Sequence, residues 1–380
     1  MDIYADNAAT TKMSTFALEA MIACMTEIYG NPSSIHSIGQ QAHQTLTDSR
    51  NKIASCLGCQ PKEIIFTSGG SESDNQALRS AAVFGAKNHK KHIVSTAFEH
   101  HAVLHTLDAL KKDGFEITLL DVPENGIIDP EQVLRAIRSD TCLVTVMYAN
   151  NEIGTIQPIT EIGAICRSKG VLFHSDAVQA VGHLPVNVRE QNIDMLSLSA
   201  HKFHGPKGVG VFYCRRDIPL TNLIFGGGQE KGKRAGTENV SGIVGMAAAL
   251  EESLTNLAEK QRKTAAMRDR LIRGLSYISR SGLNGDPERR LPGNVNFSFD
   301  DVDGESLLMM LDEKGIAASS GSACMAGSLD PSHVLLAIGC SYESAKGSLR
   351  LTIDENNTLD EIDTIIKEVT LAVETLRSLC

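Results

Sequence analysis

The chain has no tryptophan, few aromatic residues and no excess of positive charge. Its 380 residues are 42% hydrophobic, 22% charged and 4% aromatic, which is typical of a globular protein and excludes a disordered or coiled-coil chain. The formal net charge of −10 argues against direct binding to nucleic acid or to an anionic membrane, because phosphates are neutralised by basic faces. The length suggests two or three folding units.

Long apolar runs are also missing. No run approaches the ~18–20 apolar residues that span a bilayer, and the first residues, MDIYAD, lack the basic-then-apolar order of a signal peptide. The nine cysteines are an odd number scattered through a large chain, which does not indicate a disulfide framework. We therefore expect a cytoplasmic protein with no membrane partner, in which Cys142, Cys166 and Cys214 are small buried hydrophobic residues.

Short apolar runs alternate with helix-length stretches through the first two thirds of the chain. Seven runs predict strands, at Glu63–Thr67, His92–Thr96, Glu116–Leu120, Thr141–Tyr148, Val171–His174, Ile193–Ser199 and Val209–Tyr213. Because these runs are mostly apolar throughout, they favour a largely parallel sheet covered by helices on both faces, the α/β class. One helix is expected to begin at Pro130, with Asp129 as its N-cap and Gln132 completing a capping box.

The composition changes near residue 255, where a charged helix pattern begins at Leu257. We predict a large α/β domain over residues 15–255 and a smaller α+β domain formed by residues 1–14 and 256–380. Strands of the smaller domain are expected at Asn294–Asp300, Ile316–Ser319 and Ser348–Ile353. Its last helix opens with a capping box between Thr358 and Glu361.

Two reactive side chains follow strands of the predicted sheet. Lys202 comes just after the strand that ends at Ser199, and Asp176 follows the strand that ends at His174. Ligands of open α/β sheets bind beyond the carboxyl ends of the strands. A lysine can form a Schiff base with an aldehyde cofactor, and a carboxylate can keep a pyridine nitrogen protonated, which is the pair that pyridoxal phosphate needs. Taken singly, Lys202 is more simply a surface lysine and Asp176 a helix cap.

Three further segments carry chemistry. The loop Thr67–Asn75, rich in Gly and Ser, lies between a strand and a helix pattern, where free N–H groups attract a phosphate. His100 could stack on a flat ring, although it could also be an ordinary helix-end histidine. The segment Ser319–Ser328 surrounds Cys324 with small residues, which favours a reactive thiol on a movable loop over an incidental exposed cysteine.

Together these segments resemble the cysteine desulfurases of the NifS/IscS type, in the class V branch of the fold-type I enzymes that use pyridoxal phosphate. The resemblance runs from Tyr4 to about Leu376. Its most specific pieces are SAHK at 199–202, NNEIG at 150–154, GGGQE at 226–230 with RAGT at 234–237, and SGSAC at 320–324. It implies a seven-stranded, mostly parallel sheet in the large domain, pyridoxal 5′-phosphate as cofactor, L-cysteine as substrate and an active homodimer.

The resemblance also implies the catalytic roles. Lys202 would be the Schiff-base lysine, Asp176 the partner of the ring nitrogen, and His100 the residue that stacks on the ring and assists proton transfer. Cys324 would accept the sulfur as a persulfide while alanine leaves. The sulfur would then pass to an acceptor protein, either an iron–sulfur scaffold or a tRNA-thiolation enzyme, and Cys324 could transiently contact an iron–sulfur cluster.

Binding roles follow from the same resemblance. The residues implied to contact the cofactor, besides those above, are Gln179 at the phenolic oxygen, Gly70, Ser71, Ser199 and His201 at the phosphate, Asn151, and Thr237 at the phosphate of the other subunit. Asn151 and Arg350 would hold the substrate carboxylate, for which a guanidinium fork is suited. A selenocysteine lyase, an aminotransferase or a kynureninase-like hydrolase on the same scaffold remain alternatives, as does a binding module without activity. An aminotransferase has no need of a mobile thiol, and a module has no need of Lys202, Asp176, His100 and Cys324 together.

Overall fold

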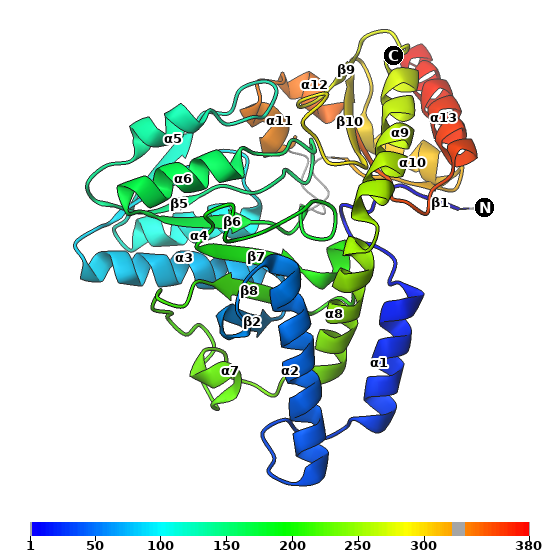
Figure 1. Cartoon of the computed structure of the whole chain (residues 1–380). Helices are drawn as coiled ribbons and strands as arrows, with labels where there is room; N and C mark the ends of the chain where they lie inside the picture. Colours follow the sequence, from blue (N-terminus) through cyan, green and yellow to red (C-terminus); the bar gives the residue numbers. More distant parts are fainter. Residues whose placement is uncertain (1, 321–330, 380) are drawn as a thin grey trace.

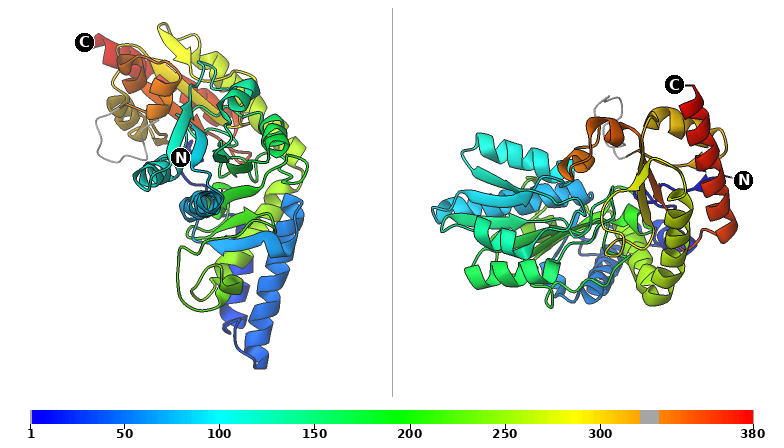
Figure 2. Two further views of the ribbon diagram at one scale, coloured as in Figure 1. Left: turned by 90° about the vertical axis from the view of Figure 1, so that its left-hand side faces the viewer. Right: turned by 90° about the horizontal axis from the view of Figure 1, so that it is seen from above.

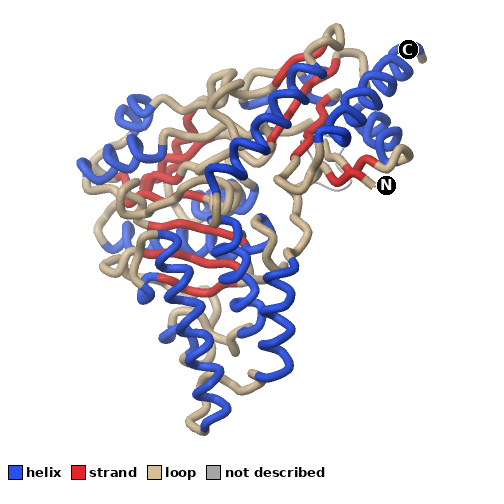
Figure 3. The backbone as a smooth tube through the Cα atoms, turned by 45° about the vertical axis from the view of Figure 1, so that its right-hand side comes forward, coloured by secondary structure: helices blue, strands red, loops and turns tan. Residues whose placement is uncertain are grey.

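A computed structural model describes residues 2–320 and 331–379. The predicted sulfur acceptor, Cys324, lies outside the described residues. The chain forms a large sheet flanked by helices and a smaller sheet beside two long helices, and both termini lie next to the smaller sheet (Figure 1). Figure 3 shows the strands in these two separate groups.

The large sheet has seven strands. Their order across the sheet is β2 (Ile64–Thr67), β8 (Gly210–Cys214), β7 (Met195–Ser199), β6 (Leu172–Asp176), β5 (Thr141–Thr145), β3 (His92–Thr96) and β4 (Glu116–Leu120). In the described ladders β8 runs antiparallel to both of its neighbours, and the other neighbours pair in parallel. The expected α/β class and mostly parallel seven-stranded sheet are confirmed, and each strand overlaps the run that predicted it.

Helices cover both faces of this sheet. The apolar sides of α3 (Gly70–Lys87) and α4 (His101–Lys112) are buried on one face. The helices α2 (Ser37–Leu57), α5 (Pro130–Ala136), α6 (Ile159–Lys169) and α8 (Val240–Leu254) contribute to the core on the other face. The right-hand view of Figure 2 shows the strands between these two layers. Helix α1 (Thr15–Glu27) packs with α2 against α8, and these long helices extend away from the sheet (Figures 1 and 2).

The start of α5 was predicted partly correctly. Asp129 is its N-cap and accepts a hydrogen bond from the Glu131 N–H, and Pro130 is the first helical residue. The capping box at Gln132 was wrong, because the Gln132 side chain donates instead to the Asp121 carbonyl in the segment after β4. A tertiary partner outside the helix has replaced the local one.

The smaller sheet is antiparallel, with the order β12 (Ser348–Thr352), β10 (Asn294–Phe299) and β9 (Ser281–Leu283). It shares a core with α9 (Leu257–Leu275), α10 (Gly304–Asp312) and α13 (Leu359–Ser378), and with Ile3 and Ala5 from the start of the chain. A short parallel pair joins β1 (Ile3–Tyr4) to β11 (Ile316–Ala317). The capping box of Thr358 and Glu361 at the start of α13 is confirmed.

Short elements complete the described chain, namely η1 (Pro61–Glu63), η2 (Ala200–Lys202), α7 (Gln229–Gly232), α11 (His333–Ala337) and α12 (Tyr342–Lys346). Cys142, Cys166 and Cys214 are buried as expected, and the seven cysteines of the described ranges are free thiols. Over residues 2–320 and 331–379, no helix combines the length and the apolar character needed to cross a bilayer.

Candidate active site

One cavity of about 390 Å³ opens at the carboxyl edge of the large sheet. The predicted site residues that line it are Gly70, Ser71, His100, Asn151, Asp176, Gln179, Ser199, His201, Lys202 and Arg350. They lie at the carboxyl ends of β6 and β7, in segments that follow β2, β3, β5, β6 and β7, and on β12 of the smaller sheet. The volume lies in the range of small-molecule sites, about 300–1,000 Å³.

Lys202 ends the short turn η2, which directly follows β7. Its Nζ donates hydrogen bonds to the carbonyls of Ala8 (2.5 Å) and Ala9 (2.8 Å). The Gln179 amide nitrogen donates to the same Ala8 carbonyl at 3.0 Å. The N-terminal segment therefore forms one wall of the cavity, opposite the sheet edge.

Asp176 is the last residue of β6, and turns follow it, so it is not a helix cap. Its Oδ1 accepts a hydrogen bond of 2.9 Å from the Val178 N–H. Burial raises the pKa of Asp176 to about 6, while the Val178 N–H and the positive charge of Lys202 act in the opposite direction. Above that pH the side chain is a buried carboxylate, which suits a cationic ring nitrogen.

His100 is the N-cap of α4, and its Nδ1 accepts a hydrogen bond from the Ala102 N–H at 3.1 Å. Burial and then the positive charge of Lys202 lower the pKa of His100 to about 4, so the ring is neutral at pH 7. Because Nδ1 accepts, the proton of the neutral ring resides on Nε2. The two interpretations of this residue are therefore compatible: it caps a helix and also lines the cavity.

The phosphate end of the cavity is the start of α3. Gly69 precedes the helix with a φ of 152°, which favours glycine. Gly70 and Ser71 lie in the first turn, where the N–H groups have no partner within the helix. A Cβ on Gly210 of β8 would lie 2.6 Å from the Cα of Gly69, so the turn is held close against the sheet. Ser199 lines the cavity beside it. A helix N-terminus with neighbouring hydroxyls is an anion site.

Arg350 reaches the cavity from β12, with its side chain 3% exposed. Its guanidinium donates to Asp6 Oδ1 at 2.9 Å and to the Asn151 carbonyl at 3.3 Å. Its Nε has no hydrogen-bond partner among the described residues. A buried guanidinium with a donor left over is a suitable place for a carboxylate.

The residues present fit pyridoxal phosphate. A lysine amine, a buried carboxylate, a neutral imidazole and a helix N-terminus line one cavity, which is the donor set that its aldehyde, ring nitrogen, ring face and phosphate need. Burial and the nearby Lys202 also lower the pKa of His201 to about 4, so this ring is neutral at pH 7. Its Nδ1 lies 3.1 Å from Thr10 Oγ1, which links it to the N-terminal wall.

Two predicted residues lie elsewhere. Thr237 is exposed, precedes α8 and does not line the cavity. Cys324 is outside the described residues, as stated above. The neighbour of His100, His101, is not among the residues that line the cavity, and its ring centroid lies 4.9 Å from that of His105 and 4.5 Å from that of His333.

Sequence reasoning missed buried carboxyls around the cavity. Asp74 lines it and is 1% exposed, and Glu99 is fully buried nearby. From the sequence alone, an acidic residue near the polar start of a helix is expected to be exposed to solvent. The available signal was spacing, because Asp74 is four residues after Gly70 and so shares its helix face.

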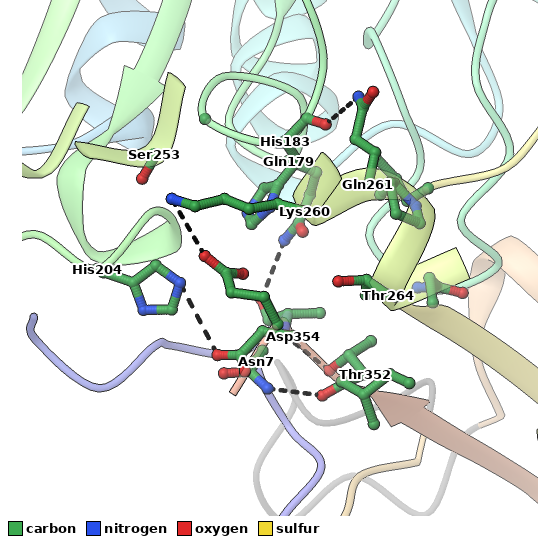
Figure 4. A pocket seen from close by; sticks show the side chains of 18 of the residues that line it. Asn7, Gln179, His183, His204, Ser253, Lys260, Gln261, Thr264, Thr352 and Asp354 are labelled. Atoms are coloured by element: carbon green, nitrogen blue, oxygen red, sulfur yellow. Dashed lines mark hydrogen bonds and ion pairs between the residues drawn. The ribbon is translucent and has the colours of Figure 1, made fainter. Parts of the chain in front are cut away.

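A second, smaller cavity of about 60 Å³ lies behind Ala8 and Gln179 (Figure 4). Polar side chains lie close to one another around it: His204 Nε2 lies 3.8 Å from Asp354 Oδ2, and Lys260 Nζ lies 3.4 Å from a Glu355 oxygen. Figure 4 shows His204 and Asp354 pointing toward one another. Its lining residues come from segments of both the large and the smaller sheet region, and none of the predicted catalytic residues is among them.

Known proteins resemble this chain over nearly its whole length. A family model described as Aminotransferase class-V matches residues 3–365. A cysteine desulfurase IscS from Methanosarcina thermophila is 48% identical over 377 residues, which cover 99% of this chain and 93% of that protein. The structure of a NifS-like protein has a TM-score of 0.93 at 38% identity and covers 99% of this chain and 100% of its own. A structure of SspA in complex with cysteine has a TM-score of 0.82 at 35% identity, over 93% and 99% of the two chains.

The sequence identity and the structural similarity extend through both sheets and therefore include every segment that lines the cavity. The chain belongs to the class-V aminotransferase family and, within it, to the cysteine desulfurases, enzymes that depend on pyridoxal phosphate.

Proposed function

We propose that this cysteine desulfurase holds pyridoxal 5′-phosphate in the cavity at the sheet edge and removes sulfur from L-cysteine there. The observation that carries the proposal is the placement of Lys202 and Asp176, which lie at the carboxyl ends of the adjacent strands β7 and β6 and line the same cavity. When bound, the cofactor supplies an aldehyde that captures an amino group and a cationic ring that stabilises negative charge at the adjacent carbon.

Each part of the cofactor has residues to hold it. Lys202 would hold the aldehyde, and Asp176 would pair with the ring nitrogen, supported by its N–H bond from Val178. The first turn of α3 would bind the phosphate, with Ser71, Ser199, His201 and Gly70 around it. Gln179 would face the phenolic oxygen, since its amide already lies at the cavity wall.

The substrate carboxylate would bind Arg350 and Asn151. The Asp6 carboxylate fixes one guanidinium nitrogen of Arg350, which orients the planar fork, and the free Nε remains to donate. The Asn151 carbonyl holds the same guanidinium from the other side. This clamp sets the amino acid in one orientation toward Lys202.

Proton transfer would be shared between two residues. The Lys202 amine is the base for the Cα proton, because it lies at the end of β7 inside the cavity. His100 carries its proton on Nε2 and is neutral, so it serves as a proton donor on the cavity side while Nδ1 stays bound to Ala102. The neutral ring is also apolar enough to stack on a flat cofactor.

Sulfur transfer would use Cys324. Its thiolate attacks the sulfur of the substrate, a sulfur–sulfur bond forms, and the carbon–sulfur bond breaks with its electron pair going to the carbon. That carbon takes up a proton, Lys202 returns the proton to Cα, and the product leaves as alanine while the persulfide stays on Cys324. The sulfur then passes to an acceptor protein, an iron–sulfur scaffold or a tRNA-thiolation enzyme, and Cys324 contacts an iron–sulfur cluster transiently.

We also infer a homodimer in the cytoplasm. The exposure of Thr237 supports a role toward the phosphate of the partner subunit, since it does not line the cavity of its own chain. The chain would divide into residues 15–255 and a second domain of residues 1–14 with 256–380. The burial of Ile3 and Ala5 in the core of the smaller sheet supports placing the N-terminus with that domain.

Two variants test the proposal. Lys202→Ala should lose the visible absorbance of covalently held cofactor and all turnover of L-cysteine. Cys324→Ala should keep that absorbance and lose persulfide formation and sulfide release. A Lys202→Ala protein that kept both properties would contradict the cofactor assignment, and undiminished sulfur release by Cys324→Ala would contradict the role of the thiol. Cys59→Ala, at a half-buried cysteine outside the cavity, is the matched control and should behave like the wild type.

A further inference from the structure

A second buried carboxyl lies beside Asp176. Asp74 is on α3, is 1% exposed and lines the same cavity. Asp74, Asp176 and His100 each bring a side-chain atom within 4.8 Å of the others. The Oδ1 atom of Asp74 has no hydrogen-bond partner in the described parts of the chain. None of the roles assigned above uses this residue.

Two carboxyls this close and this buried cannot both be ionised without a large electrostatic cost. Asp176 has the compensating interactions, namely the Val178 N–H at 2.9 Å and the positive charge of Lys202. Burial and the neighbouring Asp176 charge raise the pKa of Asp74 well above its usual value. The proton of the pair therefore belongs on Asp74.

The other groups that face Asp74 do not supply a cation. His174 Nε2 of β6 lies 3.6 Å from Asp74 Oδ1, but burial lowers the pKa of His174 to about 3, so this ring is neutral. The hydroxyl of Ser197 on β7 hydrogen-bonds the carboxyl and is uncharged. Glu99 is acidic, and burial raises its pKa to about 8. His100 is neutral for the reasons given above.

We propose that Asp74 is a positioning residue of the cofactor site, a carboxylic acid that keeps the single proton of the Asp74–Asp176 pair and so places a neutral polar group beside the ionised Asp176 that faces the ring nitrogen. The inference rests on the proposed function, because it assigns Asp176 to that nitrogen. It explains why an acidic side chain is tolerated against a carboxylate in a nearly solvent-free wall. It acts on the cofactor through Asp176 and has no part in bond making.

The protonation state can be observed directly. Asp74→Asn replaces the acid by a neutral side chain of nearly the same shape. In the infrared difference spectrum between wild type and this variant at pH 7.5, we expect the wild type to contribute the band of a protonated carboxylic acid. A difference that contains the bands of an ionised carboxylate would overturn the proposal. The measurement requires no turnover and is made on both proteins, each with and without pyridoxal phosphate.

Cofactor affinity tests the positioning role. Pyridoxal phosphate is titrated into each apoprotein and followed by absorbance. Asp74→Ala, which removes a hydrogen-bonding group next to a charge, should weaken binding about tenfold, and Asp74→Asn should stay within about threefold of wild type. Gln76→Ala is the matched control, because Gln76 is a buried, hydrogen-bonded residue of the same helix outside the cavity.

The outcomes distinguish failure of the proposed function from failure of the role proposed for Asp74. A wild-type protein that fails to bind pyridoxal phosphate refutes the proposed function itself. If the wild type binds, then unchanged affinity in Asp74→Ala refutes the positioning role. An equal loss in Asp74→Asn and Asp74→Ala shows that a neutral polar side chain of this shape is not sufficient. An equal loss in Gln76→Ala shows general damage to α3. Either result overturns the proposal.

Discussion

At the scale of single residues, burial decides which acids carry a charge. Glu99 is fully buried between β3 and α4. Its Oε1 accepts hydrogen bonds from Thr96 Oγ1 (2.8 Å) and the Met147 N–H (2.9 Å), and its Oε2 has no partner in the described ranges. Burial raises the pKa of Glu99 to about 8, against the lowering by these two donors. At neutral pH the folded protein therefore holds Glu99 protonated.

The raised pKa of Glu99 predicts that the stability of the protein depends on pH. The unfolded chain loses the Glu99 proton above its ordinary pKa of 4.5, whereas the folded chain keeps it up to about 8. The folded state binds the extra proton in this window, so Glu99 makes the protein less stable as the pH rises through it. Glu99→Gln should remove that loss and gain on the order of 1 kcal/mol relative to wild type between about pH 6 and pH 8.

Chemical denaturation at several pH values provides the measurement. The exposed Glu131 is the control, and Glu131→Gln should track the wild type at every pH. An advantage of Glu99→Gln that stayed constant between pH 6 and pH 8 would show that Glu99 is already ionised in the folded protein, contrary to the expectation.

At the scale of secondary-structure elements, the site depends on how closely the start of α3 approaches the sheet. The turn at Gly69 lies against β8, and a Cβ on Gly210 would come within 2.6 Å of both the Gly69 Cα and the Leu198 carbonyl oxygen. Both obstacles are backbone atoms, so a side chain cannot rotate away to make room. The strand and the proposed phosphate turn must therefore separate if this glycine is replaced.

Gly210→Ala is expected to displace that turn. Overpacking of this kind costs about 1–3 kcal/mol, and we expect lower stability together with at least tenfold weaker binding of pyridoxal phosphate to the apoprotein. Titration with the cofactor and urea denaturation measure the two effects. Gly282→Ala in β9 is the control, because nothing lies within 4 Å of the added Cβ there. Cofactor affinity equal to wild type in Gly210→Ala would show that the turn does not bind the phosphate.

At the scale of the whole molecule, distant segments meet at one cavity. Arg350 of the smaller sheet, Asp6 of the N-terminal segment and Asn151 of the large sheet are joined by hydrogen bonds. Lys202 is tied to Ala8 and Ala9 of the same N-terminal segment. The two sheets therefore hold the site between them, and a shift of either sheet would alter its geometry.

The proposed role of Thr237 at the phosphate of the partner subunit predicts that the protein is a dimer. We expect a particle of about 82 kDa, twice the 40.9 kDa of the chain, in a light-scattering measurement. Thr237→Ala should weaken binding of pyridoxal phosphate severalfold through loss of one hydrogen bond to the phosphate, without loss of the dimer. Thr255→Ala, at another exposed threonine, is the control and should bind normally. A monomeric wild type that bound the cofactor fully would contradict the predicted role of the partner subunit.

Much of the local structure was predictable because its causes are local. The capping box of Thr358 and Glu361 was correct, since both partners lie within one helical turn. The box at Gln132 was not, because its side chain found the Asp121 carbonyl in another segment. The strand β9 was not predicted, because Ser281–Leu283 lie in a glycine-containing segment without a strand pattern. These residues are extended because they pair with β10, which is distant from the local sequence signal.

By itself the sequence determined the order of the strands along the chain and the polar residues at their ends, because apolar runs, turns and caps involve neighbours a few positions apart. Lys202 and Asp176 could therefore be assigned to one edge of a sheet from the sequence alone. Tertiary structure alone decided the state of those groups. The neutral His100, the proton proposed for Asp74 and the Arg350–Asp6 pair each depend on burial and charge contributed by residues far away in the chain. Electrostatic energies depend on distance and solvent exclusion in space, and neither quantity is present in the order of the residues.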